Sequence, residues 1–137
     1  IELGDPGIPH AIVLMPDWDE RDHDMLRALG RTLRFAEEFP RGANVSFVKV
    51  VDVGHVKAIT YERGVEDFTL ACGTGCGSIA AALRLLGLSS DELAISMPGG
   101  ELTVSLTASG GSVQDIYLTG PTNVVCTGDI LDEDVLG

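Results

Sequence analysis

Apolar residues recur along the chain in short runs that favour strands. Eight runs are rich in β-branched or apolar residues and are separated by residues that favour turns. They are residues 1–4, 11–15, 44–51, 56–62, 93–97, 102–107, 113–118 and 123–130. In the run 102–107, Leu and Val alternate with Thr and Ser, which is typical of a half-buried strand. The residues between the first two runs, 5–10, predict a turn that His10 closes.

Two other segments predict helices, and the first has the 3.6-residue period of an amphipathic helix. After Asp19, one apolar face is formed by Met25, Leu26, Leu29 and Leu33. This segment predicts an amphipathic surface helix, and the chain after it turns at Pro40. The second segment, residues 74–86, is apolar on nearly every side. The helix that it predicts must therefore be surrounded by the rest of the protein.

Helices and strands do not alternate regularly along the chain, which argues against a doubly wound parallel sheet. The economical arrangement is an α+β fold in which a mostly antiparallel, curved sheet or barrel wraps around the helix at 74–86. The first helix then packs on the outside of that sheet. With 137 residues, 45% of them hydrophobic, the chain is predicted to form a single domain over residues 1–137.

The charge, hydropathy and cysteine content of the chain argue against several classes of protein. A net charge of −12 argues against binding a nucleic-acid backbone, which needs clustered Lys and Arg. No apolar run is long enough to predict a membrane span. Three cysteines without a dense spacing pattern do not predict a secreted disulfide scaffold, so we expect a reducing compartment such as the cytoplasm. The chain starts at Ile1 rather than Met, which favours a fragment or a processed product.

The stretch from Thr69 to Ser78 carries the strongest chemical signal. Its sequence, TLACGTGCGS, predicts a strand, a glycine turn and the start of the apolar helix. Cys72 then sits at a helix start, where free N–H groups and the positive end of the helix dipole can hold a carboxylate and favour a thiolate over a thiol. A thiolate can act as a nucleophile or as a base. The alternative is a buried structural cysteine.

The other cysteines do not indicate a metal site. Cys72 and Cys76 form a Cys-x3-Cys pair without the further ligands that zinc needs, and the three histidines of the chain have no ligand spacing with them. We therefore predict no metal. We expect Cys76 to be a packing residue and Cys126 to lie in a core strand.

Glu62 and Arg63 stand at the end of a predicted strand, just before the cysteine loop. A carboxylate can accept hydrogen bonds from an ammonium group, and a guanidinium can bind a carboxylate through two parallel hydrogen bonds. The pair therefore matches the two charged groups of an amino acid, although it also fits an exposed ion pair at a strand end. His10 is a weaker candidate, because a histidine after a proline turn is more often a turn or packing residue.

Several short motifs occur in a fixed order along nearly the whole chain. They are Gly7-Ile8-Pro9-His10, residues 44–48 (NVSFV), residues 61–65 (YERGV), residues 69–75 (TLACGTG), residues 98–102 (PGGEL) and Gly120-Pro121. The most specific part is Glu-Arg-Gly followed by Ala-Cys-Gly-Thr-Gly. In order and spacing, these motifs resemble the C-terminal half of the diaminopimelate epimerase family.

The resemblance implies a protein of two similar halves, each a sheet around a central helix, with the active site in the cleft between them. It implies the epimerisation of LL-diaminopimelate to meso-diaminopimelate, a step in lysine and peptidoglycan precursor biosynthesis. The family uses two cysteines and no cofactor. By this resemblance Cys72 is one of the two, so that the thiolate of one removes the α-proton and the thiol of the other returns a proton on the opposite face.

Further site residues follow from the same family pattern. The resemblance implies that the backbone amides of Gly73 and Thr74 bind the α-carboxylate at the reacting centre. It implies that the far end of the amino-acid substrate is recognised by Asn44, Glu62 and Arg63. It also implies that Glu62 lies near Cys72 and that His10 lies near the second catalytic cysteine.

The chain departs from the family in three places. The family's first cysteine lies in an N-terminal motif of the Gly-Asn-Gly-x-Arg-Cys type, which this sequence lacks. We therefore expect the C-terminal domain only, inactive alone and partnered by the missing N-terminal half, or by a second copy that brings two Cys72 loops together. Phe68 and Ile8 stand where family members often have Glu and Asn, which can alter the substrate. A proline racemase-like enzyme and a noncatalytic carboxylate-binding module are the alternative interpretations.

Overall fold

The computed structural model describes residues 1–4, 7–19 and 22–129. This part of the chain contains two helices, α1 (His23–Arg34) and α2 (Gly73–Leu85). Its strands are β1 (Glu2–Gly4), β2 (Gly7–Leu14), β3 (Asn44–Asp52), β4 (His55–Glu62), β5 (Asp67–Thr69), β6 (Glu92–Met97), β7 (Gly100–Ser109) and β8 (Ser112–Thr119). Neither of the two helices has the length and the apolar character that a membrane span requires.

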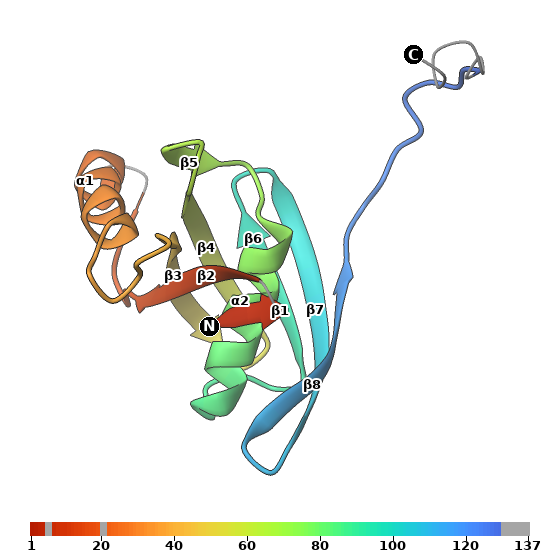
Figure 1. Ribbon diagram of the computed structural model, residues 1–137. Coiled ribbons are helices and arrows are strands. Elements are labelled where there is room, and N and C mark those ends of the chain that lie inside the picture. The colour runs from red at the N-terminus through yellow and green to blue at the C-terminus, as the bar shows by residue number, and fades with distance from the viewer. Residues whose placement is uncertain (5–6, 20–21, 130–137) are drawn as a thin grey trace.

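One sheet contains all the strands of the described residues, in the order β1-β2-β3-β4-β6-β7-β8, with the short β5 paired to β4. Most neighbours are antiparallel, whereas β2 with β3 and β4 with β6 are parallel. The sheet curls around α2 and leaves α1 on its outside (Figure 1). The structure thus confirms the predicted α+β fold with a mostly antiparallel, curved sheet around the apolar helix.

The central helix α2 is buried on most of its surface because nearly all its side chains are apolar or small. It contributes Cys76, Ile79, Ala80 and Leu83 to the main core. The sheet contributes Val48, Val56, Leu93, Ile95 and Val104, among others. At Gly77 the helix has no side chain, and a Cβ there would lie only 2.9 Å from the Leu3 Cδ1 atom of β1. This close packing fixes the position of the helix and of its N-terminus.

A second, smaller core joins α1 to the convex face of the sheet. On the helix, Leu26 is fully buried, and Leu29 and Leu33 pack beside it. The sheet contributes Val45, Phe47, Ile59 and Tyr61. Met25, which the periodicity placed on the same face, is 49% exposed, because each step along a helix rotates the side chain by about 100° and Leu26 takes the buried direction.

Alternation along the strands decides which side chains face α2 and which face α1. The α2 side of β3 consists of Asn44, Ser46 and Val48, and the α1 side holds Val45 and Phe47. The α2 side of β4 includes Ala58 and Thr60, and the Thr60 hydroxyl shares a 2.9 Å hydrogen bond with that of Ser46. By the same alternation Glu62, the last residue of β4, is on the α2 side.

Two expectations about the ends of the chain are wrong. Residues Gly7 to His10 belong to β2 rather than to a turn, because they pair with β1 and β3, while Asp5 and Pro6 lie outside the described residues. Residues 123–129 form no strand, and Val124 is 88% exposed. After β8 the chain runs away from the sheet (Figure 1), so this β-prone stretch meets no strand to pair with. Ile130 lies outside the described residues.

Candidate functional site

Cys72 is the N-cap residue of α2 and has an extended backbone, with φ −138° and ψ 103°. The helix begins directly at Gly73, so the predicted glycine turn is wrong, and Gly73, Gly75 and Gly77 all lie inside α2. No side-chain hydrogen bond caps this helix end, and Gly73 and Thr74 are exposed. The first N–H groups of a helix have no acceptor within it. The amides of the first turn are therefore available to a carboxylate.

The Cys72 sulfur lies just below the surface, since the residue is 6% exposed. The Asn44 amide nitrogen Nδ2 is 3.9 Å from Sγ, a long contact, and the Thr74 hydroxyl Oγ1 is 3.8 Å from it. A Cβ at Gly75 would lie 3.1 Å from Sγ. The glycine thus leaves room for the sulfur, and two polar side chains reach it.

The orientation of Asn44 follows from its other contact. Its Oδ1 accepts a 2.7 Å hydrogen bond from the backbone N–H of Arg63. The strand register brings these two residues together, because Val45 of β3 pairs with Tyr61 of β4. With Oδ1 engaged, the amino group of Asn44 points to Cys72. The residue is buried, so its amide acts as a fixed donor toward the sulfur.

His10 lies on β2 beside Asn44 of β3 and is 1% exposed. Its Nε2 shares a 3.1 Å hydrogen bond with the Thr74 hydroxyl, and its Nδ1 is buried without a partner among the described residues. Burial, followed by the charge of the terminal amino group, lowers the pKa of His10 to about 4. The imidazole is therefore neutral at pH 7. His10, Thr74 and Cys72 form one chain of contacts.

The low pKa of His10 makes the stability of the fold depend on pH. The neutral ring is favoured in the folded state, so its stabilising contribution is fully present above pH 6.5 and is lost as the pH falls toward 4. Full loss corresponds to roughly 3 kcal/mol at most. Urea unfolding between pH 7.5 and 4.5 should show a steeper loss of stability for the unmodified protein than for His10→Gln. Equal slopes for the two proteins would contradict this role.

Glu62 and Arg63 lie at the same end of the sheet as Asn44, but neither contacts Cys72 through a hydrogen bond. The Arg63 guanidinium donates a 2.9 Å hydrogen bond to the backbone carbonyl of Arg41. The Glu62 carboxylate is half-buried and has no hydrogen bond to another described residue. The structure thus brings Cys72, Asn44, Thr74 and His10 into contact, with Glu62 and Arg63 beside them.

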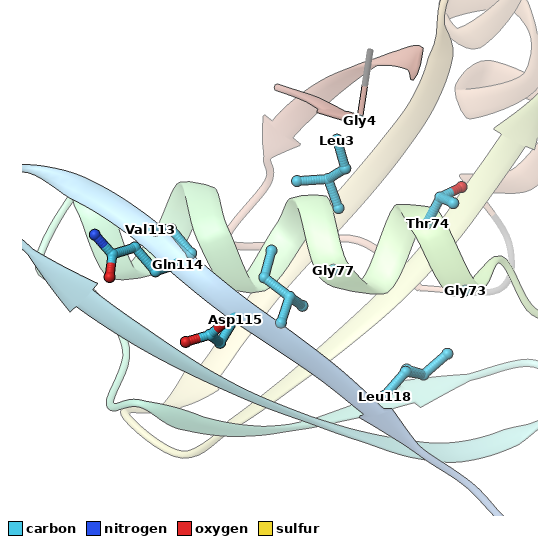
Figure 2. A pocket seen from close by; sticks show the side chains of 10 residues that line it. Leu3, Gly4, Gly73, Thr74, Gly77, Val113, Gln114, Asp115 and Leu118 are labelled. Atoms are coloured by element: carbon cyan, nitrogen blue, oxygen red, sulfur yellow. The ribbon is translucent and has the colours of Figure 1, made fainter. Parts of the chain in front are cut away.

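A groove of about 580 Å³ runs along α2 from its N-terminus. Figure 2 shows it between β1, which contributes Leu3, and β8, which contributes Leu118. The groove includes the exposed backbone of Gly73 and the Thr74 side chain, so one end of it meets the surroundings of Cys72. Its walls are mostly apolar. The site is open on this side within the described residues.

A sequence model described as diaminopimelate epimerase matches residues 4–125. The chain belongs to the diaminopimelate epimerase family. It is 31% identical over 126 residues to the diaminopimelate epimerase of Alkaliphilus metalliredigens. The aligned region covers 92% of this chain and 42% of that protein. It is 35% identical over 127 residues to that of Methanothrix thermoacetophila, again covering 42% of the relative. The chain therefore spans less than half the length of these relatives.

Solved structures share the fold of this diaminopimelate epimerase family member at lower identity. A PhzF family phenazine biosynthesis protein of Bacillus anthracis matches with a TM-score of 0.53 and 22% identity, over 82% of this chain and 34% of that one. A probable proline racemase of Agrobacterium radiobacter matches with a TM-score of 0.52 and 17% identity, over 74% and 30% of the two chains. These matches concern the fold alone.

The two residues that depart from the diaminopimelate epimerase pattern lie in different places. Phe68 is on the α1 face of the sheet, with its ring centroid 6.1 Å from that of Tyr61, so it packs on the side away from Cys72. Ile8 is two residues before His10 on β2 and shares its face. Ile8 is 38% exposed. Ile8 is therefore on the same side of the sheet as His10, and Phe68 is on the opposite side.

The remaining cysteines have no part in this site. Cys76 is fully buried in the core, as predicted, and burial raises the pKa of its thiol to about 12. Cys126 is exposed, which corrects the expectation of a core position, because the segment after β8 does not join the sheet. In the described ranges, no group of three or more His, Cys, Asp or Glu side chains is arranged to hold a metal ion.

One contact was missed by sequence reasoning. The family pattern gave Thr74 a role only through its backbone amide, whereas its hydroxyl touches both Cys72 and His10. Helix side chains lean toward the N-terminus, so a hydroxyl two residues after an N-cap cysteine can reach back to the sulfur. The position of Thr74 two residues after Cys72 was the feature of the sequence from which this contact could have been predicted.

Proposed function

We propose that this chain is one half of a cofactor-independent, two-base diaminopimelate epimerase, which interconverts LL-diaminopimelate and meso-diaminopimelate. Cys72 is one of its two acid/base groups. The observation that carries the proposal is the sulfur at the start of α2, reached by Asn44 and Thr74 and placed next to uncapped helix amides. Membership of the family supports the substrate.

The proposed reaction needs no oxidant or reductant. The Cys72 thiolate takes the α-proton and becomes a thiol, and the electron pair of the broken C–H bond stays on the substrate, delocalised into its carboxylate. The amides of Gly73 and Thr74 stabilise the charge that develops there. The thiol of the second cysteine then gives its proton to the opposite face of the carbon and becomes a thiolate. The reverse direction exchanges the two roles.

The far end of the substrate is assigned to Asn44, Glu62 and Arg63. The Glu62 carboxylate has no partner among the described residues and can accept hydrogen bonds from an ammonium group. The Arg63 guanidinium contacts only a backbone carbonyl, which a substrate carboxylate can outcompete. Together they match the amino and carboxyl groups of the distal centre.

The second cysteine belongs to the other half of the same protein, which faces the open side of the site. His10 lies near that cysteine in this arrangement, and this chain alone is inactive. The alternative partner is a second copy of this chain with its own Cys72. Free cysteines and the reaction itself agree with a cytoplasmic enzyme of lysine and peptidoglycan precursor synthesis.

Deuterium exchange tests this function and separates it from the alternatives. The full-length protein in D₂O should incorporate deuterium at the α-carbon of LL-diaminopimelate, which mass spectrometry detects, and should leave proline unchanged. Exchange into proline instead would favour a proline racemase-like enzyme. A protein that exchanges neither amino acid, and whose Cys72 is not labelled by an electrophilic substrate analogue faster than Cys126, would be a noncatalytic carboxylate-binding module.

A further inference from the structure

A second cavity lies on the other face of the sheet from Cys72. It has a volume of about 710 Å³, within the usual range of small-molecule sites. We call it the lysine groove, after its two lysines. The polar and aromatic residues that line it are Trp18, Asp19, His23, Lys49, Lys57 and Ser96. Lys49 alternates with Val45 and Phe47 on β3, which places it on the α1 side of the sheet.

The two lysines of the groove are the only lysines of the chain. They are direct partners across β3 and β4, an arrangement in which like charges repel. In the described part of the chain, neither ammonium group has an ion pair or a hydrogen bond. The chain has a net charge of −12, yet none of its described carboxylates is paired with either lysine.

Trp18 and His23 also line the cavity. The indole N–H of Trp18 is buried and has no acceptor among the described residues, although a buried donor without a partner is costly. His23 is the first residue of α1, and no side-chain hydrogen bond caps that helix end. Among the described residues that line the groove, Asp19 is the one carboxylate, so this part of the lining has a net positive charge.

We propose that the lysine groove binds a small organic anion through a phosphate or carboxylate group. The oxyanion lies between Lys49 and Lys57 and relieves their repulsion, and the Trp18 ring lies in the wall of the same groove. The apolar part of the ligand lies against the remaining lining residues, Ala58, Ile59, Met97 and Pro98. Lysine binds either oxyanion as a point charge, so both sources share this chemistry.

Trp18 is the only tryptophan of the chain, so its fluorescence reports on this groove. Phenyl phosphate, benzoate and inorganic phosphate are the probes, each titrated into the chain at constant ionic strength. We expect a saturable change with phenyl phosphate or benzoate, and the tighter of the two identifies the oxyanion. Inorganic phosphate should bind at least tenfold more weakly, because it lacks the apolar part. A change that sodium chloride reproduces would overturn the proposal.

The Lys49→Glu variant separates binding from folding. It places opposite charges across β3 and β4, so the melting temperature should rise, while the affinity for the tighter probe should fall at least tenfold. Arg31→Gln removes a cation near the other end of α1 and should leave the affinity unchanged. If Lys49→Glu binds the probes as tightly as the unmodified chain, the lysine groove is not an anion site.

Discussion

Replacing Cys72 with alanine is expected to lower the rate of α-proton exchange in diaminopimelate by about 10²–10⁴-fold, the usual contribution of a positioned acid or base. Alanine keeps the helix start but has no group that can carry the proton. The Asn44 amide and the Thr74 hydroxyl, which reach the sulfur in the native site, cannot replace it, since neither is a base at neutral pH. The measurement is deuterium incorporation by the full-length protein.

The matched control for this loss is Cys126→Ser. Cys126 is exposed in the segment after β8, so its thiol can be removed without a change in the site or in the core. We expect this variant to exchange deuterium at the rate of the unmodified protein. Far-UV circular dichroism of Cys72→Ala should match the parent protein. Should Cys72→Ala exchange deuterium as fast as Cys126→Ser, Cys72 would be a structural cysteine and the proposed mechanism would be wrong.

Local sequence patterns were sufficient for the elements that build the main core. The all-round apolar stretch predicted α2 and its burial, and the β-branched runs predicted β3 and β4 close to their observed bounds. These signals are strong because burial itself selects the residues: a helix inside a curved sheet has no face for polar side chains. The position of Cys72 at the start of α2 followed from the same pattern.

Contacts between distant segments could not be read from the chain. His10 and Thr74 are 64 residues apart, and the pairing of β2 with β3 together with the packing of α2 on β2 brings them into contact. The motif around His10 contains Gly and Pro, which predict a turn locally, yet pairing with a neighbouring strand makes it part of β2. At residues 123–129 the sequence predicted a strand that the structure does not contain. The residues favour β-structure, but no strand of the described part of the chain pairs with them.

The same reasoning applies to the candidate site. Family motifs identified Asn44, Glu62 and Arg63 as one group, and the β3–β4 register places them together. The donor role of the Asn44 amide toward sulfur depends on the Arg63 backbone N–H, which no sequence pattern contains. Side-chain direction is thus set by tertiary contacts, whereas the choice of residues is visible in the sequence.

Replacing Leu83 with alanine is expected to lower the free energy of unfolding by about 2–5 kcal/mol, as large-to-small changes in packed cores do. Leu83 is fully buried on α2, among side chains of β3, β4, β6 and β7. The curved sheet holds the helix on several sides, so the surroundings cannot easily close the cavity that the missing atoms leave. Urea unfolding followed by circular dichroism measures the change.

Leu85→Ala is the matched control, because it makes the same chemical change two residues later on the same helix. Leu85 is 46% exposed, and alanine is at least as good a helix former as leucine. We therefore expect a loss below about 1 kcal/mol, since little apolar surface is removed from the core. If both variants lose the same stability, the burial of Leu83 within the sheet would not be what stabilises α2. The position of Cys72 would then not depend on the packing of the helix core.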